Sequence, residues 1–334
     1  MEYRILGKTG LRVSALGFGC GNVGGLIIRE EPRTRVRAVA RAIEAGINYF
    51  DTASMYGNGQ SEQNLGQVLN ELKPDVYVGT KVRIRPDEMG DLRGAIHRSV
   101  EASLTRMARD QVDLIQLHNH IVQRRTPGGE RDAALTSQEV LEDVITAFRQ
   151  LQADGKVRFY GITGLGDTAA LFEVINSTLL HTVQVCYNLL NPSAGYPVPR
   201  GFPSQDFRLL IDRATAQGMG SIGIRVLAAG ALSGQAARHP IAVPSVEPIG
   251  SGPDYRTDVE HARALAFLVE EGYASTLVEA AMRFAWNKTN LLTALVGFSS
   301  MEHLEQAITA QARGGLPAAA LERLTQAWAQ LAAA

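Results

Sequence analysis

The sequence predicts a (β/α)8 (TIM) barrel in a single domain spanning residues 1–334. Short apolar runs alternate eight times with amphipathic helical segments, and no linker separates the two halves of the chain. The runs are apolar at successive positions, which is typical of parallel strands buried on both faces. In such a barrel, the side chains at the carboxyl ends of the strands carry the chemistry.

The elements follow in order along the chain. Residues 3–13 predict a β-hairpin, because two apolar runs flank the Gly7–Gly10 turn. Apolar runs between turn signals predict strands at 14–19, 47–50, 76–81, 112–118, 157–163, 182–187, 220–227 and 291–298. Apolar residues at helical spacing predict helices at 33–46, 61–72, 91–107, 137–155, 167–175, 204–218, 276–288 and 300–310, an extra helix at 258–272 and a C-terminal helix at 321–334.

Composition argues against several classes of partner. The net charge is −1 without a basic cluster, so neither nucleic acid nor an anionic membrane surface is expected to bind. Cys20 and Cys186 lie far apart in sequence, which predicts neither a disulfide framework nor a metal site. The N-terminus has no signal pattern, and we expect a cytoplasmic monomer or weak homo-oligomer that acts on a small molecule.

Ionisable side chains end three consecutive strands. Asp51, Lys81 and His118 hold these positions, and Tyr56 follows in the first of the loops. A lysine ammonium beside a phenol favours the phenolate, and an aspartate beside the lysine keeps the ammonium charged. His118 could donate a hydrogen bond to a carbonyl oxygen. The set predicts proton transfer to an oxygen while another group attacks carbon.

Each residue also has an ordinary structural interpretation. Asp51 could form a turn or cap a helix, Tyr56 could pack with its hydroxyl at the surface, and Lys81 could be solvated. His120 could take the place of His118. Together, these four residues indicate an active site more specifically than any one of them does alone.

The segment GINYFDTASMYGNGQSEQNLG, the lysine of VYVGTK and the histidine of DLIQLH resemble the signature of the aldo-keto reductase family. The resemblance covers nearly the whole chain. It implies a (β/α)8 barrel with an N-terminal hairpin closing its base. It also implies that Tyr56 is the general acid or base, Lys81 tunes it, Asp51 pairs with Lys81, and His118 orients the carbonyl. A nicotinamide cofactor would then exchange a hydride with an aldehyde, ketone or sugar.

The same resemblance places the nicotinamide amide beside Thr163 and Gln184, whereas Gly164 stands where the family carries an amide side chain. The segment GIRVLAAGALSG, residues 223–234, lies where many members stack a tyrosine on the ring. The resemblance assigns cofactor binding here to Arg225, Leu227 and Gly230, with Ile224 the alternative to Arg225 beside the ring.

The adenosine end is expected at VGFSSMEHLEQA. Ser299 and Ser300 precede a helix whose N-terminus can bind a phosphate, and we add His303 and Gln306 to this site. The alternative is a serine cap on an ordinary surface helix. NADP(H) is the expected cofactor and NAD(H) is the alternative.

The stretch GCGNVG begins with Gly19, Cys20 and Gly21 and matches the pattern G-x-G-x-x-G. A Rossmann dinucleotide site needs a helix to open at these glycines, but LIIREEPRTR intervenes and Pro32 precedes the predicted helix. We therefore interpret the stretch as a loop at the barrel mouth where backbone can approach the nicotinamide or substrate.

Met55, Tyr56, His118 and Asn119 are the predicted substrate-pocket residues, walled by loops 119–136 and 188–203. Arg124 and Arg125 could meet an anionic substrate or be plain solvated charges.

Two other functions remain open: a cofactor-binding regulatory subunit of a channel with vestigial activity, and an isomerase acting on phosphorylated sugars. The retained Asp51, Tyr56, Lys81 and His118 favour an oxidoreductase. The isomerase would leave Lys81 and Tyr56 without a joint role.

Overall fold

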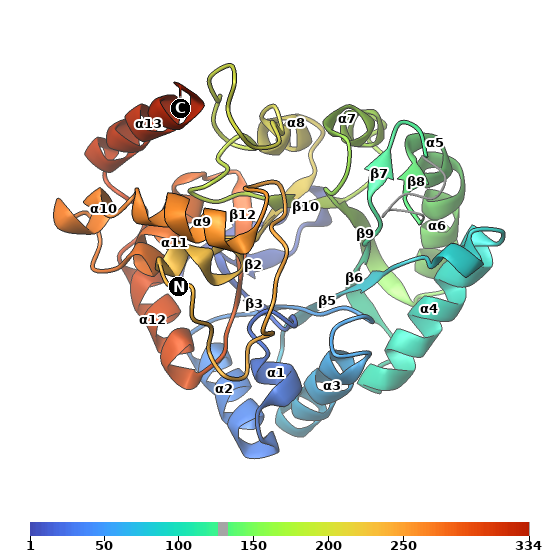
Figure 1. The fold of residues 1–334 in the computed structure, drawn as a ribbon. Helices are drawn as coiled ribbons and strands as arrows, with labels where there is room; N and C mark the ends of the chain where they lie inside the picture. Colours follow the sequence, from blue (N-terminus) through green and yellow to red (C-terminus); the bar gives the residue numbers. More distant parts are fainter. Residues whose placement is uncertain (126–132, 334) are drawn as a thin grey trace.

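The computed structural model describes residues 1–125 and 133–333, and its main sheet is a closed barrel of parallel strands (Figure 1). Around the ring the order is β10 (Thr182–Cys186), β11 (Gly220–Ile224), β12 (Leu291–Gly297), β3 (Leu16–Gly19), β4 (Tyr49–Asp51), β5 (Tyr77–Val82), β6 (Val112–Leu117) and β9 (Val157–Thr163). This arrangement confirms the predicted barrel.

Helices surround the barrel (Figure 1). Those that connect successive strands include α2 (Pro32–Glu44), α3 (Gln60–Leu72), α4 (Leu92–Met107), α6 (Ile145–Ala153), α7 (Thr168–Asn176), α8 (Leu210–Ala216) and α11 (Leu277–Asn287), and α12 (Met301–Ala312) and α13 (Ala318–Ala333) follow the last strand. Their apolar faces and the outer faces of the strands form one continuous core. Within the described residues, no helix is long and apolar enough to cross a membrane.

The N-terminal hairpin closes the base of the barrel. Strands β1 (Tyr3–Ile5) and β2 (Arg12–Ser14) pair antiparallel around a turn in which Gly10 has a φ of 70°. Lys8 N donates to Gly218 O at 2.7 Å, and Arg4 Nη1 donates to Leu291 O at 2.6 Å. These carbonyls lie at the amino ends of β11 and β12, so the opposite end of the barrel stays available for a site.

Several predicted boundaries were wrong, each for a local reason. The predicted helix 204–218 begins at Leu210, because Arg208 and Leu209 adopt φ values of 51° and 58°. The predicted strand 220–227 ends at Ile224, because Arg225 has a φ of 56°. The helical run 137–155 comprises α5 (Ser137–Glu139), a π-helical segment η3 (Val140–Val144) and α6, and the extra helix divides into α9 (Tyr255–Arg263) and α10 (Phe267–Glu270).

Several short elements were not predicted. A one-turn helix, α1 (Leu26–Arg29), follows the glycine-rich stretch, and β7 (Ile121–Val122) pairs with β8 (Leu135–Thr136) within loop 119–136. The predicted pocket wall at residues 126–132 of that loop lies outside the described residues.

Candidate active site

The predicted polar residues meet at the carboxyl ends of neighbouring strands. Asp51 is the last residue of β4, Lys81 is the next-to-last residue of β5, and His118 directly follows β6. Lys81 pairs in register with Gln116, so His118 lies two residues beyond the position opposite Lys81. Side chains two residues apart on a strand share a face, which directs all of these groups into the barrel mouth.

A buried ion pair lies at the bottom of the mouth. Lys81 Nζ donates to Asp51 Oδ1 and, at 2.8 Å, to the carbonyl oxygen of Thr52. Gln184 Nε2 donates to Asp51 Oδ2 at 2.7 Å, and only 1% of Lys81 and 3% of Asp51 are exposed. Burial alone would lower the pKa of Lys81, but the Asp51 carboxylate and the Tyr56 phenol leave that pKa raised. Lys81 is therefore held as an ammonium.

Tyr56 and His118 lie above this pair and are both half-buried. Lys81 Nζ is 4.9 Å from the centroid of the Tyr56 ring, and the Tyr56 and His118 ring centroids are 6.0 Å apart, nearly perpendicular. Burial first, and then Lys81 and other cations, hold the pKa of His118 well below its ordinary value. The imidazole is therefore neutral at physiological pH.

The glycine-rich loop and the predicted amide-binding residues adjoin this cluster. Gly19 pairs in register with Asp51, and buried Cys20 donates its backbone N–H to Asp51 O at 2.9 Å. A Cβ at Gly21 would lie 3.5 Å from Tyr56 Cε2, so this glycine packs directly on the tyrosine ring. Thr163 Oγ1 donates to Gln184 Oε1 at 3.5 Å.

A steric constraint explains why position 164 is a glycine, where the family signature carries a residue with an amide side chain. A Cβ at Gly164 would lie 2.8 Å from the carbonyl oxygen of Gln184, and Gly164 N donates to that same oxygen at 2.7 Å. This backbone path leaves no space for a side chain.

The cofactor-binding residues predicted after β11 are Arg225, expected beside the nicotinamide ring, and Leu227 and Gly230. Arg225 Nη1 donates to Glu247 O at 3.0 Å, and burial lowers the pKa of this guanidinium. Leu227 precedes the 3-10 helix η4 (Ala228–Ser233), within which Gly230 adopts a φ of 105°. In the described part of the chain no carboxylate forms an ion pair with Arg225, so its charge is available to an anion.

The predicted adenosine residues surround the start of α12. Ser299 Oγ donates to Gly24 O at 2.8 Å, and Ser300 Oγ caps the helix by accepting from His303 N at 3.2 Å. His303 is half-buried, and burial followed by neighbouring His239 lowers its pKa. Gln306 lies one turn further along, where its Nε2 donates to Glu302 Oε1 at 3.2 Å.

The predicted pocket residues differ in how they face the mouth. Met55 is exposed, and its Sδ lies 3.8 Å from Arg83 Nη1. Asn119 is buried, with Oδ1 accepting from Ile84 N at 2.8 Å and Nδ2 donating to Ala133 O at 2.7 Å. The amide of Asn119 therefore shapes the mouth by joining two loops.

Sequence reasoning missed two contributors to the mouth. Ser61 Oγ donates to Cys20 O and contacts Thr52 Oγ1, both at 2.8 Å, which ties the tyrosine loop to the glycine-rich loop. The other contributor is Arg83, which directly follows β5 and which strand alternation places on the same face as Lys81. Strand alternation, applied past the predicted end of the strand, was the signal that would have identified it.

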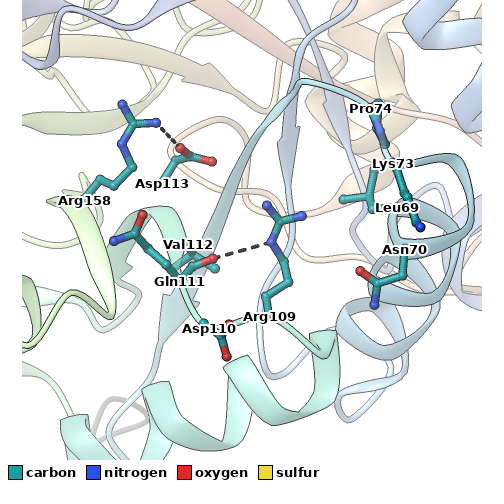
Figure 2. A pocket seen from close by; sticks show the side chains of 10 residues that line it. All are labelled: Leu69, Asn70, Lys73, Pro74, Arg109, Asp110, Gln111, Val112, Asp113 and Arg158. Carbon is teal, nitrogen blue, oxygen red and sulfur yellow. Dashed lines mark hydrogen bonds and ion pairs between the residues drawn. The ribbon is translucent and has the colours of Figure 1, made fainter.

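A surface hollow lies elsewhere on the barrel. Figure 2 shows it where β6 begins, lined by Leu69, Asn70, Lys73, Pro74, Arg109, Asp110, Gln111, Val112, Asp113 and Arg158. The Asp113–Arg158 ion pair (2.6 Å) stands in it, and Asp113 also accepts from Val78 N. This is the amino-terminal end of the strands, where polar networks stabilise the barrel, so we assign the hollow no chemistry. Within the described residues, no cluster of His, Cys, Asp and Glu could hold a metal ion.

Fold and mouth together define the class: an α/β barrel with a buried ion pair, a phenol and a neutral imidazole at the carboxyl ends of its strands. The model described as the aldo/keto reductase family matches residues 15–329, so the chain belongs to this family of oxidoreductases.

Comparison with individual proteins agrees with that membership. An L-galactose dehydrogenase from Arabidopsis thaliana is 28% identical over 93% of this chain and 88% of its own length. A putative voltage-gated potassium channel subunit beta from Schizosaccharomyces pombe is 26% identical over the same shares, 93% and 88%. An aldo-keto reductase from Klebsiella pneumoniae, solved in complex with NADPH, has the same fold at 21% identity and a TM-score of 0.67, covering 98% of this chain and 95% of that one.

Replacing Lys81 by methionine should destabilise the protein by about 3–5 kcal/mol, because Asp51 would remain buried without its counter-charge. Urea unfolding measures the loss. Lys156→Met is the control, since Lys156 and Glu101 form an exposed ion pair whose removal should cost at most about 1 kcal/mol. Equal losses in the two variants would contradict a buried, charged Lys81.

The depressed pKa of His118 predicts a pH dependence of stability. The unfolded chain takes up a proton near the ordinary histidine pKa of about 6.5, whereas folded His118 stays neutral to lower pH. The unfolding free energy should therefore fall as pH drops below that value, by at most about 1.4 kcal/mol per pH unit from this group. Urea unfolding at several pH values should show a shallower fall in His118→Gln. His97→Gln, which removes an exposed hydrogen bond to Gln150, should keep the wild-type slope.

Proposed function

We propose that this protein is an NADP(H)-dependent oxidoreductase acting on the carbonyl or alcohol carbon of an aldehyde, ketone or sugar. The observation that carries the proposal is the convergence of Tyr56, His118, Lys81 and Asp51 at one mouth. Family membership and the NADPH complex of the Klebsiella pneumoniae relative support it.

The residues present fit a dinucleotide. Arg225 is a partly buried cation without a carboxylate partner in the described chain, and it suits a diphosphate. Thr163 and Gln184 offer a hydroxyl and an amide beside Asp51, where a nicotinamide amide could bind. The N-terminus of α12 offers its dipole to a phosphate at the adenosine end. When bound, NADP(H) would supply or accept the hydride.

Within this proposal the chain's own groups move and position one proton. Tyr56 gives a proton to the carbonyl oxygen in reduction and takes it back in oxidation. Lys81, held as an ammonium by Asp51, stabilises the phenolate that reduction leaves. Neutral His118 donates a hydrogen bond to the same oxygen and orients the substrate.

Tyr56→Phe is the direct test. Turnover should fall by about 10²-fold or more, because the general acid is lost, while NADPH affinity stays nearly unchanged. Turnover is followed by NADPH absorbance with aldehydes, ketones and sugars, in both directions, and affinity by NADPH fluorescence. Tyr77→Phe removes a hydroxyl at the amino end of β5 and should behave as wild type. Undiminished turnover in Tyr56→Phe would remove Tyr56 from its role. Tight NADPH binding without wild-type turnover would favour a regulatory subunit.

His303→Arg tests the choice between the two dinucleotides. The lowered pKa of His303 leaves it uncharged, so a permanent guanidinium at the α12 N-terminus should strengthen binding of a 2′-phosphate. NADP affinity should rise by about tenfold, equivalent to about 1.4 kcal/mol. NAD, which lacks that phosphate, serves as the control and should bind as before. Equal gains for both dinucleotides would place the 2′-phosphate elsewhere.

A further inference from the structure

Arg83 lies at the mouth beside the reaction centre. Within β5 and β6, Lys81 pairs with Gln116 and Val82 with Leu117, and His118 N donates to Val82 O at 2.8 Å. Arg83 and His118 are the first residues after these strands, and the register extended by one residue brings them opposite each other. Because alternate residues of a strand share a face, both side chains point to the mouth.

The guanidinium of Arg83 has no anionic partner in the described chain. It is exposed, and its Nη1 lies 3.8 Å from the Sδ atom of Met55, the neighbour of Tyr56 in the sequence. Arg125, which sequence analysis considered for an anionic substrate, is instead paired with Glu139. Among the described residues, Arg83 is thus an unpaired cation that follows β5, the neighbour of the strand before His118. A neutral substrate would not require such a cation.

Arg83 and Arg225, neither of which has an ion-pair partner among the described residues, lie on different sides of the mouth. Arg83 directly follows β5 and Arg225 directly follows β11, and these strands stand four places apart in the ring of eight. Arg225 adjoins the residues proposed to hold the diphosphate, so a bound dinucleotide would neutralise it. Arg83 would remain free to meet the substrate. Both cations depress the pKa of His118, which is consistent with their pointing toward it.

We propose that Arg83 is a specificity-determining residue and that the substrate is an anionic carbonyl compound, carrying a carboxylate or phosphate group, or the corresponding alcohol. A guanidinium binds such oxygens through paired, charge-assisted hydrogen bonds. The oxyanion docks on Arg83 while the carbonyl oxygen lies between Tyr56 and His118. This inference rests on the proposed oxidoreductase function and names its substrate class.

Calorimetry on the NADP⁺-saturated protein tests it, because the cofactor then occupies the side of Arg225. Glycerol 3-phosphate and 4-hydroxybutanoate represent phosphate and carboxylate ligands, and glycerol and 1,4-butanediol are their neutral counterparts. In wild type, at least one anion should bind tenfold or more tightly than its neutral counterpart, and the tighter anion identifies the preferred group. Arg83→Gln should weaken that anion at least tenfold and leave the neutral compounds unchanged.

Two further variants separate a local contact from a general charge effect. Arg83→Lys keeps the charge without the planar fork and should retain part of the preference. Arg85→Gln removes an exposed arginine of the same segment that is paired with Asp87 and Glu88, and anion affinity should stay within twofold of wild type. Equal losses in Arg83→Gln and Arg85→Gln, or no wild-type preference for an anion, would overturn the proposal.

Failure of the role proposed for Arg83 can be distinguished from failure of the proposed oxidoreductase function. Turnover of neutral carbonyl compounds without an anion preference would reject the role of Arg83 alone. Anion binding that depends on Arg83, in a protein that turns over none of the carbonyl compounds, would reject the oxidoreductase and keep the site.

Discussion

The buried ion pair between Lys81 and Asp51 is the interaction on which the mouth depends. Charges removed from water are stable only when each is paired and its remaining hydrogen-bonding capacity is satisfied. Lys81 meets Asp51 and the Thr52 carbonyl, and Asp51 also receives the amide of Gln184. Gln184 comes from β10, which is not a neighbour of β4 in the ring. The pair is thus complete only when the barrel is closed.

The charge of this pair also acts on Tyr56 and His118, the other two groups of the mouth. A fixed ammonium under the Tyr56 ring places positive charge where a phenolate can form, and it also opposes a second charge on His118. The cation that lies beside the phenol ring therefore also favours neutrality of the imidazole. In the proposed mechanism, proton transfer and hydrogen-bond donation would be divided between Tyr56 and His118, whose ring centroids are 6.0 Å apart.

Much of this arrangement could be predicted from the sequence, because it depends on the ends of strands. Asp51, Lys81 and His118 each close an apolar run, and parallel strands bring their ends together whatever the details of the helices. The start of α8 at Leu210 could not be predicted. The left-handed backbone of Arg208 and Leu209 interrupts a helix-like pattern of apolar residues, and no glycine marks the interruption. The role of the Asn119 amide, shared between the backbones of Ile84 and Ala133, arises only from the folded loops.

The placement of charge around the mouth also bears on how two anions could share it. A dinucleotide diphosphate and an oxyanion on the substrate repel each other, and within a low-dielectric mouth that repulsion is weakly screened. Arg225 and Arg83 follow β11 and β5, on opposite sides of the ring, and Tyr56 and His118 follow the strands on either side of β5. Each anion would then have its own counter-charge, and the carbonyl would be held where the phenol and the imidazole can both reach its oxygen. In a barrel, such a separation requires only that the two arginines follow strands on opposite sides of the ring. Substrate specificity would then depend on residues other than those proposed to transfer the proton.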